Sequence, residues 1–214
     1  MVRTALLSLL LLLLSASARA QGDSRYVIYL HGRIVEEEGR RPTHPDFGTY
    51  EYDAILDSLR RSGFIVLSEQ RPRGTDSDAF ASRVARQVDS LLSLGVSPGA
   101  ITVIGFSKGG WIAILASSQL RNPAVSFVFM GACGPWAFDK ADLHVSGRLL
   151  SIYETSDAQG VSCASMFARR SPGSLAREIA LSLGRQHGTF FQPRSAWLDL
   201  VVAWARGYEP LPSR

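Results

Sequence analysis

Several features that would assign a chain to a specialised class are absent from this sequence of 214 residues. Lysine and arginine form no continuous basic stripe, and the arginine pairs at 40–41, 60–61 and 169–170 stand apart, so nothing favours nucleic-acid binding. No close group of histidine and carboxylate residues has the spacing of a metal site, and we expect neither a metal nor a cofactor. Residues 21–214 contain no repeat or low-complexity segment, and they are long enough for one domain with a real core.

Hydrophobic runs long enough to cross a membrane are also missing. Arg3 precedes an apolar run at 5–14, and a small-residue pattern ending in Ala18 and Ala20 follows. The run is too short for a hydrocarbon layer of about 30 Å, and its flanks are typical of a secretory signal peptide. We therefore expect residues 1–20 to be removed, leaving a secreted or periplasmic domain without a stable membrane anchor. Loss of two arginines lowers the formal net charge from +4 to +2.

Cysteine is scarce, with Cys133 and Cys163 as the two examples. An even number of cysteines in an exported protein favours a disulfide, and two buried thiols are the alternative. A bridge closing a loop of about thirty residues contributes roughly 3 to 4 kcal/mol through the unfolded state.

Short apolar runs alternate with helical patterns along the rest of the chain. The runs typical of buried strands lie at 26–30, 64–67, 101–104, 125–130, 149–153 and 178–183. Strands buried on both faces and separated by amphipathic helices predict an α/β fold. We expect a three-layer α/β/α sandwich around a mostly parallel sheet of about six strands. The polar segment from Arg33 to Tyr52 is predicted to be a long loop with a solvated acidic run.

The segment after the strand at 101–104 carries the most informative motif, Gly105-Phe-Ser107-Lys-Gly109. A strand, a G-x-S-x-G turn and a helix together form a nucleophile elbow, in which the serine hydroxyl stands above the strand end. The spacing alone is weak evidence, because Gly95-Val-Ser97-Pro-Gly99 also matches it. That second copy precedes a strand, so the context selects Ser107 as the nucleophile.

A serine nucleophile needs a histidine base and a carboxylate that orients it, placed in loops after later strands. His187 follows the last predicted strand, whereas His144 precedes the strand that would carry the acid. Glu154 and Asp157 compete for the role of the acid. Asp157 is preferred, because it lies in a loop free to reach His187.

A tetrahedral intermediate also needs donors for its oxyanion. The backbone N–H of Lys108, directly after the nucleophile, is one candidate, and its side chain is expected to point to solvent. The backbone N–H of Arg33 in His31-Gly32-Arg33 is the other candidate, because Gly32 permits a close approach. Aromatic residues that could line a pocket or pack in the core are Tyr50, Phe106, Trp136 and Phe138.

The strand end at 29–32, the elbow at 105–109, the Asp157 loop and Gln-His-Gly at 186–188 together resemble the α/β-hydrolase family. The resemblance covers about Tyr26 to Gly207 and implies a compact, single-domain member. It implies a Ser107–His187–Asp157 triad and an acyl-enzyme intermediate. The short segment at 131–147 leaves no room for a large lid.

We therefore expect an exported serine hydrolase that acts on a small-molecule carboxylic ester, with a thioester or an amide as other possible substrates. An acyltransferase with the same triad and a non-catalytic binding protein on this scaffold are the rival interpretations. Oligomeric state is left open by the sequence.

Overall fold

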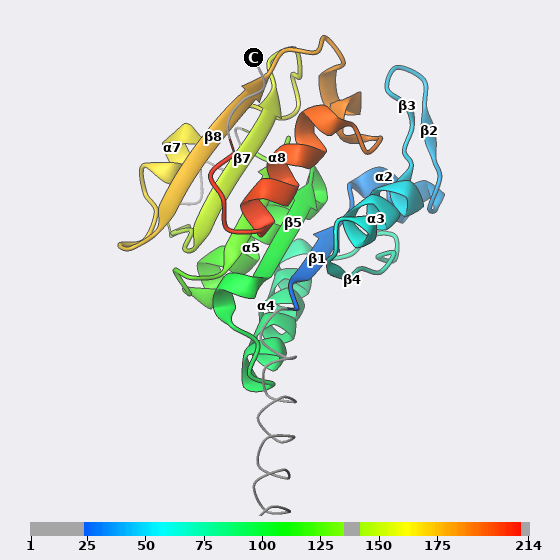
Figure 1. The fold of residues 1–214 in the computed structure, drawn as a ribbon. Helices are drawn as coiled ribbons and strands as arrows, with labels where there is room; N and C mark the ends of the chain where they lie inside the picture. Colours follow the sequence, from blue (N-terminus) through cyan, green and yellow to red (C-terminus); the bar gives the residue numbers. More distant parts are fainter. Residues whose placement is uncertain (1–23, 135–141, 211–214) are drawn as a thin grey trace, which may run out of the picture.

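The structure, a computed structural model, describes residues 24–134 and 142–210. Within these ranges a single six-stranded sheet runs through the molecule between two layers of helices (Figure 1). Its strands are β1 (Tyr26–Leu30), β4 (Ile65–Leu67), β5 (Ile101–Phe106), β6 (Ser126–Met130), β7 (Arg148–Glu154) and β8 (Leu175–Leu181). The helices are α2 (Arg33–Glu38), α3 (Tyr52–Arg61), α4 (Ser77–Ser93), α5 (Lys108–Leu120), α7 (Ala164–Phe167) and α8 (Ser195–Ala205). Short 3-10 turns lie at η1 (Pro98–Ala100) and η2 (Gln186–Phe190).

All neighbouring strands of this sheet are parallel, in the order β4-β1-β5-β6-β7-β8. The register aligns Leu30 with Gly105 and Phe106 with Met130, so the carboxyl ends of the central strands meet at one edge. The predicted α/β/α sandwich is confirmed. Loops that follow β1, β5, β7 and β8 therefore reach the same end of the molecule.

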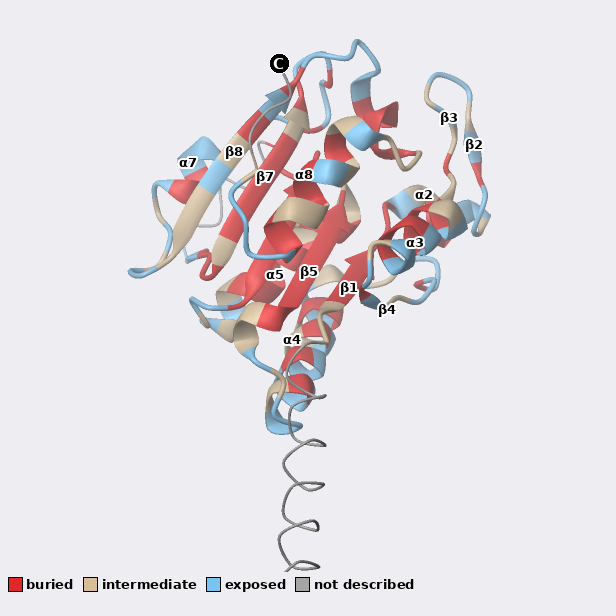
Figure 2. Ribbon diagram, viewed as in Figure 1, coloured by how far each residue is buried: buried red, intermediate tan, exposed pale blue. Residues whose placement is uncertain are grey.

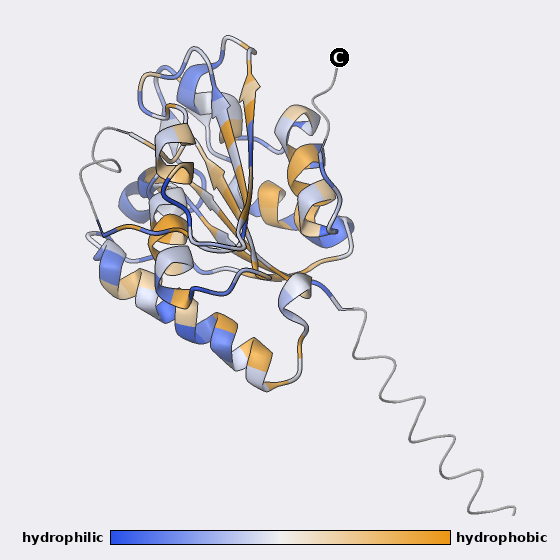
Figure 3. Ribbon diagram, turned by 90° about the vertical axis from the view of Figure 1, so that its left-hand side faces the viewer, coloured by the Kyte–Doolittle hydropathy of each residue, from blue (hydrophilic) through white to orange (hydrophobic). Residues whose placement is uncertain are grey.

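Two apolar cores hold the layers together, one on each face of the sheet. Helices α4 and α5 cover one face, and the buried apolar cluster there includes Val84, Ile112 and Phe127. Helices α3 and α8 cover the other, where Trp197 and Trp204 are buried. Figure 3 shows the sheet edge-on between these layers, and in Figure 2 the central strands are buried along their length. Each fully buried large apolar side chain contributes roughly 1.5 to 3 kcal/mol relative to exposure.

The expectation of a long loop from Arg33 to Tyr52 is wrong. The segment forms α2 and then a two-stranded hairpin of β2 (Thr43–His44) and β3 (Gly48–Thr49). The N–H of Glu51 donates to the carbonyl of Phe191 at 2.8 Å, so the segment is attached to the region after η2. The acidic run is also not simply a solvated face, because Glu36 is buried while Glu37 and Glu38 are exposed.

Cys133 and Cys163 form a disulfide with an S–S distance of 2.02 Å, which confirms the predicted pairing. The bridge joins the segment after β6 to the start of α7, and the N–H of Val161 donates to the carbonyl of Cys133 at 2.9 Å. The loop between β7 and α7 is thus attached to the segment that follows β6. In the described residues, no helix is both long and apolar enough to cross a membrane.

Candidate active site

Ser107 occupies the turn between β5 and α5 in a strained backbone conformation. Its φ of 53° and ψ of −122° are unusual for a residue with a Cβ atom. Two hydrogen bonds hold this conformation: the N–H of Ser107 donates to the carbonyl of Met130, and the N–H of Trp111 donates to the carbonyl of Ser107, both at 2.9 Å. In this conformation, Ser107 lies at the edge of the sheet where the strands end.

The two glycines of the motif permit a close approach between helix and sheet. A Cβ atom on Gly105 would lie 2.2 Å from the carbonyl oxygen of Gly109, and one on Gly109 would lie 2.0 Å from that of Leu30. Neither glycine has a positive φ; within the motif, that conformation falls on Ser107 itself. The G-x-S-x-G pattern therefore reflects the tight packing of α5 against β1 and β5.

His187 in η2 and Asp157 in the loop after β7 form a buried pair. The Nδ1 atom of His187 lies 2.6 Å from Oδ2 of Asp157. An ionised carboxylate only accepts hydrogen bonds, so Nδ1–H donates and Nε2 of the neutral ring carries a lone pair. In the part of the chain that the structure describes, Nε2 is buried without a hydrogen-bond partner.

Ser107 and His187 line the same two adjoining clefts. A cleft of about 480 Å³ extends over Trp111 and Gly131, and one of about 290 Å³ extends toward Phe47. The structure thus brings Ser107, His187 and Asp157 to one site, although no hydrogen bond joins Nε2 of His187 to the serine.

The backbone N–H groups of Lys108 and Arg33 lie at the first positions of α5 and α2. The N–H groups of a first helical turn have no partner within the helix, so they are available to an oxyanion. A Cβ atom on Gly32 would lie 3.6 Å from the Cβ of Ser107, which places the start of α2 beside the serine. Both predicted donors therefore border Ser107.

The expectation that the Lys108 side chain points to solvent is wrong. Its ammonium donates to Oε2 of Glu36 and to the carbonyl of Thr75, each at 2.7 Å. Arg71 is 1% exposed and pairs with Oε1 of the same carboxylate at 2.7 Å, so it is unavailable to an anionic substrate. Burial lowers the pKa of Arg71, and the contact with Glu36 opposes that shift.

His31, which directly precedes Gly32 and Arg33, is a fully buried structural residue. Its Nε2 accepts a hydrogen bond from the N–H of Arg71 at 2.9 Å, so Nδ1 carries the proton and donates to the carbonyl of Gly32 at 2.8 Å. Burial, followed by the charge of Arg71, lowers the pKa of His31 to about 3. The ring is neutral at physiological pH.

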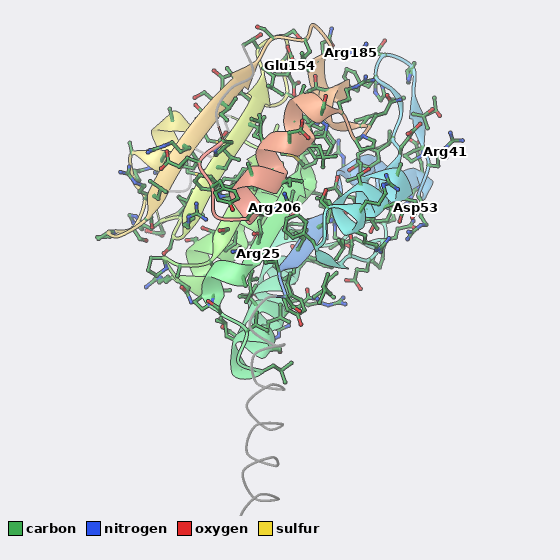
Figure 4. All side chains as sticks on the ribbon, in the orientation of Figure 1. Arg25, Arg41, Asp53, Glu154, Arg185 and Arg206 are labelled. Atoms are coloured by element: carbon green, nitrogen blue, oxygen red, sulfur yellow. A yellow bond between two sulfur atoms is a disulfide. The ribbon has the colours of Figure 1, made fainter. Side chains whose placement is uncertain are left out.

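Glu154, the rival candidate for the acid, has another role. It is fully buried at the end of β7, which Figure 4 shows beside the loop that carries Arg185. Its carboxylate accepts hydrogen bonds from the N–H groups of Leu183 and Gly184 and from the hydroxyl of Thr189. It therefore anchors the chain on both sides of His187. The only sequence signal for this role is a carboxylate at the end of a buried strand.

The aromatic residues singled out from the sequence have different places. The ring of Phe106 is buried 4.7 Å from that of His187 and borders the smaller cleft. Tyr50 is a core residue, whose hydroxyl lies 2.7 Å from that of Tyr29. Trp136 and Phe138 lie outside the described residues.

The remaining two histidines are His144 and His44. His144 is exposed, with Nδ1 3.0 Å from the carbonyl of Arg169. His44 stacks on Phe47 at the rim of the smaller cleft, with ring centroids 4.3 Å apart. Across residues 24–134 and 142–210, no three histidine, cysteine or carboxylate side chains form a group that could hold a metal.

Solved structures share this architecture at low sequence identity. An esterase of the archaeon Pyrobaculum calidifontis has a TM-score of 0.59 at 17% identity, over 87% of this chain and 78% of that one. An arylesterase has a TM-score of 0.58 at 13% identity, over 86% and 76%. SOBER1 of Arabidopsis thaliana has a TM-score of 0.56 at 11% identity, over 86% and 98%. No protein-family model and no curated protein matches the sequence. The likeness shows that the chain has the α/β-hydrolase fold.

Proposed function

We propose that this α/β-hydrolase-fold protein is a serine hydrolase that cleaves a carboxylic ester through an acyl-enzyme. The observation that carries the proposal is the state of His187. Its Nδ1 lies 2.6 Å from Oδ2 of Asp157, while its Nε2 is buried without a hydrogen-bond partner among the described residues and lines the same clefts as the strained Ser107. A lone pair in that position has one obvious use, the removal of a proton from a neighbouring hydroxyl.

In the first half of the reaction, Nε2 of His187 takes the proton of Ser107 as Oγ forms a bond to the ester carbonyl carbon. The carbonyl oxygen becomes an oxyanion and accepts from the N–H groups of Lys108 and Arg33. The carbon–oxygen bond to the alcohol then breaks, and the alcohol leaves with the proton from His187. An acyl group remains on Ser107.

In the second half, His187 removes a proton from water as the water oxygen attacks the acyl carbon. The new oxyanion collapses, the bond to Oγ breaks, and Ser107 recovers the proton from His187. Asp157 stays ionised and stabilises the imidazolium that forms in both halves. The carboxylic acid is the second product.

The shape of the site supports a small-molecule ester as substrate. Clefts of about 480 and 290 Å³ meet at Ser107, which provides separate space for the acyl group and the alcohol. The larger cleft is bounded by Trp111 and the smaller by Phe47 and Phe191, so apolar surface is present on both sides. The esterases among the structural neighbours also favour this substrate class.

Hydrolysis of p-nitrophenyl esters of graded acyl length by the purified protein tests the proposal. We expect turnover of at least one ester and a loss of about a thousandfold or more in Ser107→Ala. Ser97→Ala is the matched control, because Ser97 lies in the other G-x-S-x-G sequence and is exposed before β5. Ser107→Ala with full activity would contradict the proposal.

We further propose that the mature protein is exported and begins at Gln21. The Cys133–Cys163 disulfide supports this, because such bonds persist in oxidising compartments. Amino-terminal sequencing of the protein recovered from the secreted or periplasmic fraction tests the cleavage site. Recovery of the intact chain from the cytosol would contradict it.

A further inference from the structure

The two proposed oxyanion donors lie on separate helices that are distant in sequence. Arg33 begins α2 and Lys108 begins α5. Helix α2 has six residues, and its N-cap residue is Gly32, which has no side chain to cap the helix. A helix this short is not stable by itself, so its position must be set by tertiary contacts. Tertiary contacts must therefore also align the backbone N–H of Arg33 with that of Lys108.

A continuous series of polar contacts joins the two donors. The ammonium of Lys108 donates to Oε2 of Glu36, and Nε of Arg71 donates to Oε1 of the same carboxylate, both at 2.7 Å. The backbone N–H of Arg71 donates to Nε2 of His31 at 2.9 Å. The proton on Nδ1 of His31 then reaches the carbonyl of Gly32 at 2.8 Å.

The last contact fixes the direction of the Arg33 amide. The carbonyl of Gly32 and the N–H of Arg33 belong to one peptide unit, and the described residues contain no cis peptide bond. In a trans peptide the two groups point in opposite directions. Because His31 holds the carbonyl on the buried side, the N–H of Arg33 faces away from His31, and Gly32 and Arg33 both border the cleft of Ser107.

We infer that Glu36, clamped between Arg71 and the Lys108 side chain, is a positioning residue that keeps the two oxyanion amides in register. The inference rests on the proposed function. Glu36 is not a catalytic residue, because its side chain is 1% exposed and both oxygens are occupied by cations. Lys108 thus contributes twice, through its amide to the oxyanion and through its ammonium to the alignment of that amide with Arg33.

The charges of the cluster suit this role. Two cations share one carboxylate, so the cluster formed by Glu36, Arg71 and Lys108 carries a net charge of +1 behind the amides. A buried carboxylate in such contacts has few alternative positions, because loss of a partner leaves an uncompensated charge. We expect α2 and the residues His31 and Gly32 before it to be rigid for this reason.

Lys108→Met is the decisive variant, because it removes the ammonium and keeps the backbone N–H. Glu36 remains paired with Arg71 in this variant, so the protein is expected to fold. We expect kcat to fall about 10- to 100-fold with KM within threefold, since misaligned donors lose transition-state stabilisation. Glu36→Gln is expected to behave alike, and Lys108→Arg to recover kcat to within about fivefold of wild type. Asp57→Asn, which removes an exposed carboxylate paired with Arg60, is the control.

Two further measurements separate alignment from general loosening of the fold. Titration with a fluorophosphonate counts the folded, reactive sites, and kcat is expressed per reactive site. The affinity of an alkyl boronic acid, whose tetrahedral serine adduct places an oxygen where the oxyanion forms, is expected to weaken in proportion to kcat. A loss of kcat with unchanged boronic acid affinity would overturn the inference.

Two other results would also overturn it. One is wild-type kcat in both Lys108→Met and Glu36→Gln while Ser107→Ala is inactive, and this result leaves the proposed hydrolase intact. The other is an equal loss in Lys108→Met and Lys108→Arg, because the ion pair would then be irrelevant. A wild-type protein without turnover or fluorophosphonate labelling removes the proposed function and the inference together.

Discussion

Oδ2 of Asp157 lies 2.6 Å from Nδ1 of His187, although the two residues are thirty positions apart in the chain. The contact exists because β7 and β8 are parallel neighbours whose carboxyl ends meet, with each residue in the loop that follows its strand. Three residues before Asp157, the buried Glu154 accepts hydrogen bonds from the N–H groups of Leu183 and Gly184, which precede His187 in the chain. Two carboxylates close in sequence thus have different tasks, and their variants should differ accordingly.

Asp157→Asn should reduce kcat strongly and leave the fold intact. An asparagine can present its amide N–H₂ to Nδ1, which favours the tautomer with the proton on Nε2 and removes the lone pair needed for base catalysis. Loss of about a thousandfold to ten-thousandfold in kcat is expected, by analogy with the same change in a serine protease. Steady-state kinetics on a p-nitrophenyl ester measure it. A loss below tenfold would argue against Asp157 as the orienting acid.

Glu154→Gln should show the reverse pattern, with a large effect on stability and a smaller one on chemistry. The glutamine N–H₂ would face N–H donors from Leu183 and Gly184, and hydrogen bonds to a charged group contribute about 1.5 to 3 kcal/mol each. We expect the free energy of unfolding to fall by about 2 to 4 kcal/mol in urea denaturation. An unchanged midpoint would show that the carboxylate is not a structural anchor.

The Cys133→Ala/Cys163→Ala variant should unfold more easily than the oxidised protein. The bridge closes a loop with a sequence separation of 30 residues, and cross-links of this length stabilise by about 3 to 4 kcal/mol through the unfolded state. Urea denaturation of the wild type with and without a reductant should give the same difference. Identical curves for all three samples would contradict this expectation.

The stability of the protein should decrease on acidification through His31. Its pKa is lowered from 6.5 to about 3 in the folded state, so between these values the unfolded chain binds a proton that the folded chain does not. The contribution of His31 to the free energy of unfolding has its full value above pH 6.5. Between pH 6.5 and about 3 it decreases by up to about 1.4 kcal/mol per pH unit as the pH falls.

The variant His31→Gln isolates this term, because glutamine keeps a donor and an acceptor and does not titrate. Urea denaturation at pH 7 and at pH 4.5 should show a smaller loss for the variant than for the wild type. Equal losses would mean that His31 does not carry the pH dependence.

Local patterns in the sequence are sufficient to predict the sheet, the elbow and the disulfide. Ser107 stands between a run of β-branched residues and a helical segment, and Cys133 has one possible partner. The order of residues after successive strands also led to His187 and Asp157. These features depend on a few adjacent positions or on chain order, both of which are visible without coordinates.

The parts that the sequence did not reveal depend on distant pairings. Glu36 and Lys108 are 72 positions apart, so nothing near Lys108 indicates that its side chain is held by a carboxylate. Helix α2 was not predicted because its six residues contain only two apolar side chains, the buried Val35 and the partly buried Ile34, and these adjacent residues show no helical period. The anchoring role of Glu154 likewise depends on partners 29 to 35 positions away in the chain, which are Leu183, Gly184 and Thr189.

The central claim is that Ser107 is a nucleophile activated by His187, and fluorophosphonate labelling followed by peptide mass spectrometry tests it most directly. We expect one adduct per chain, on the peptide that contains Ser107, with labelling lost in Ser107→Ala and slowed strongly in His187→Ala. An adduct on another residue, or an untouched wild-type chain, would contradict the claim.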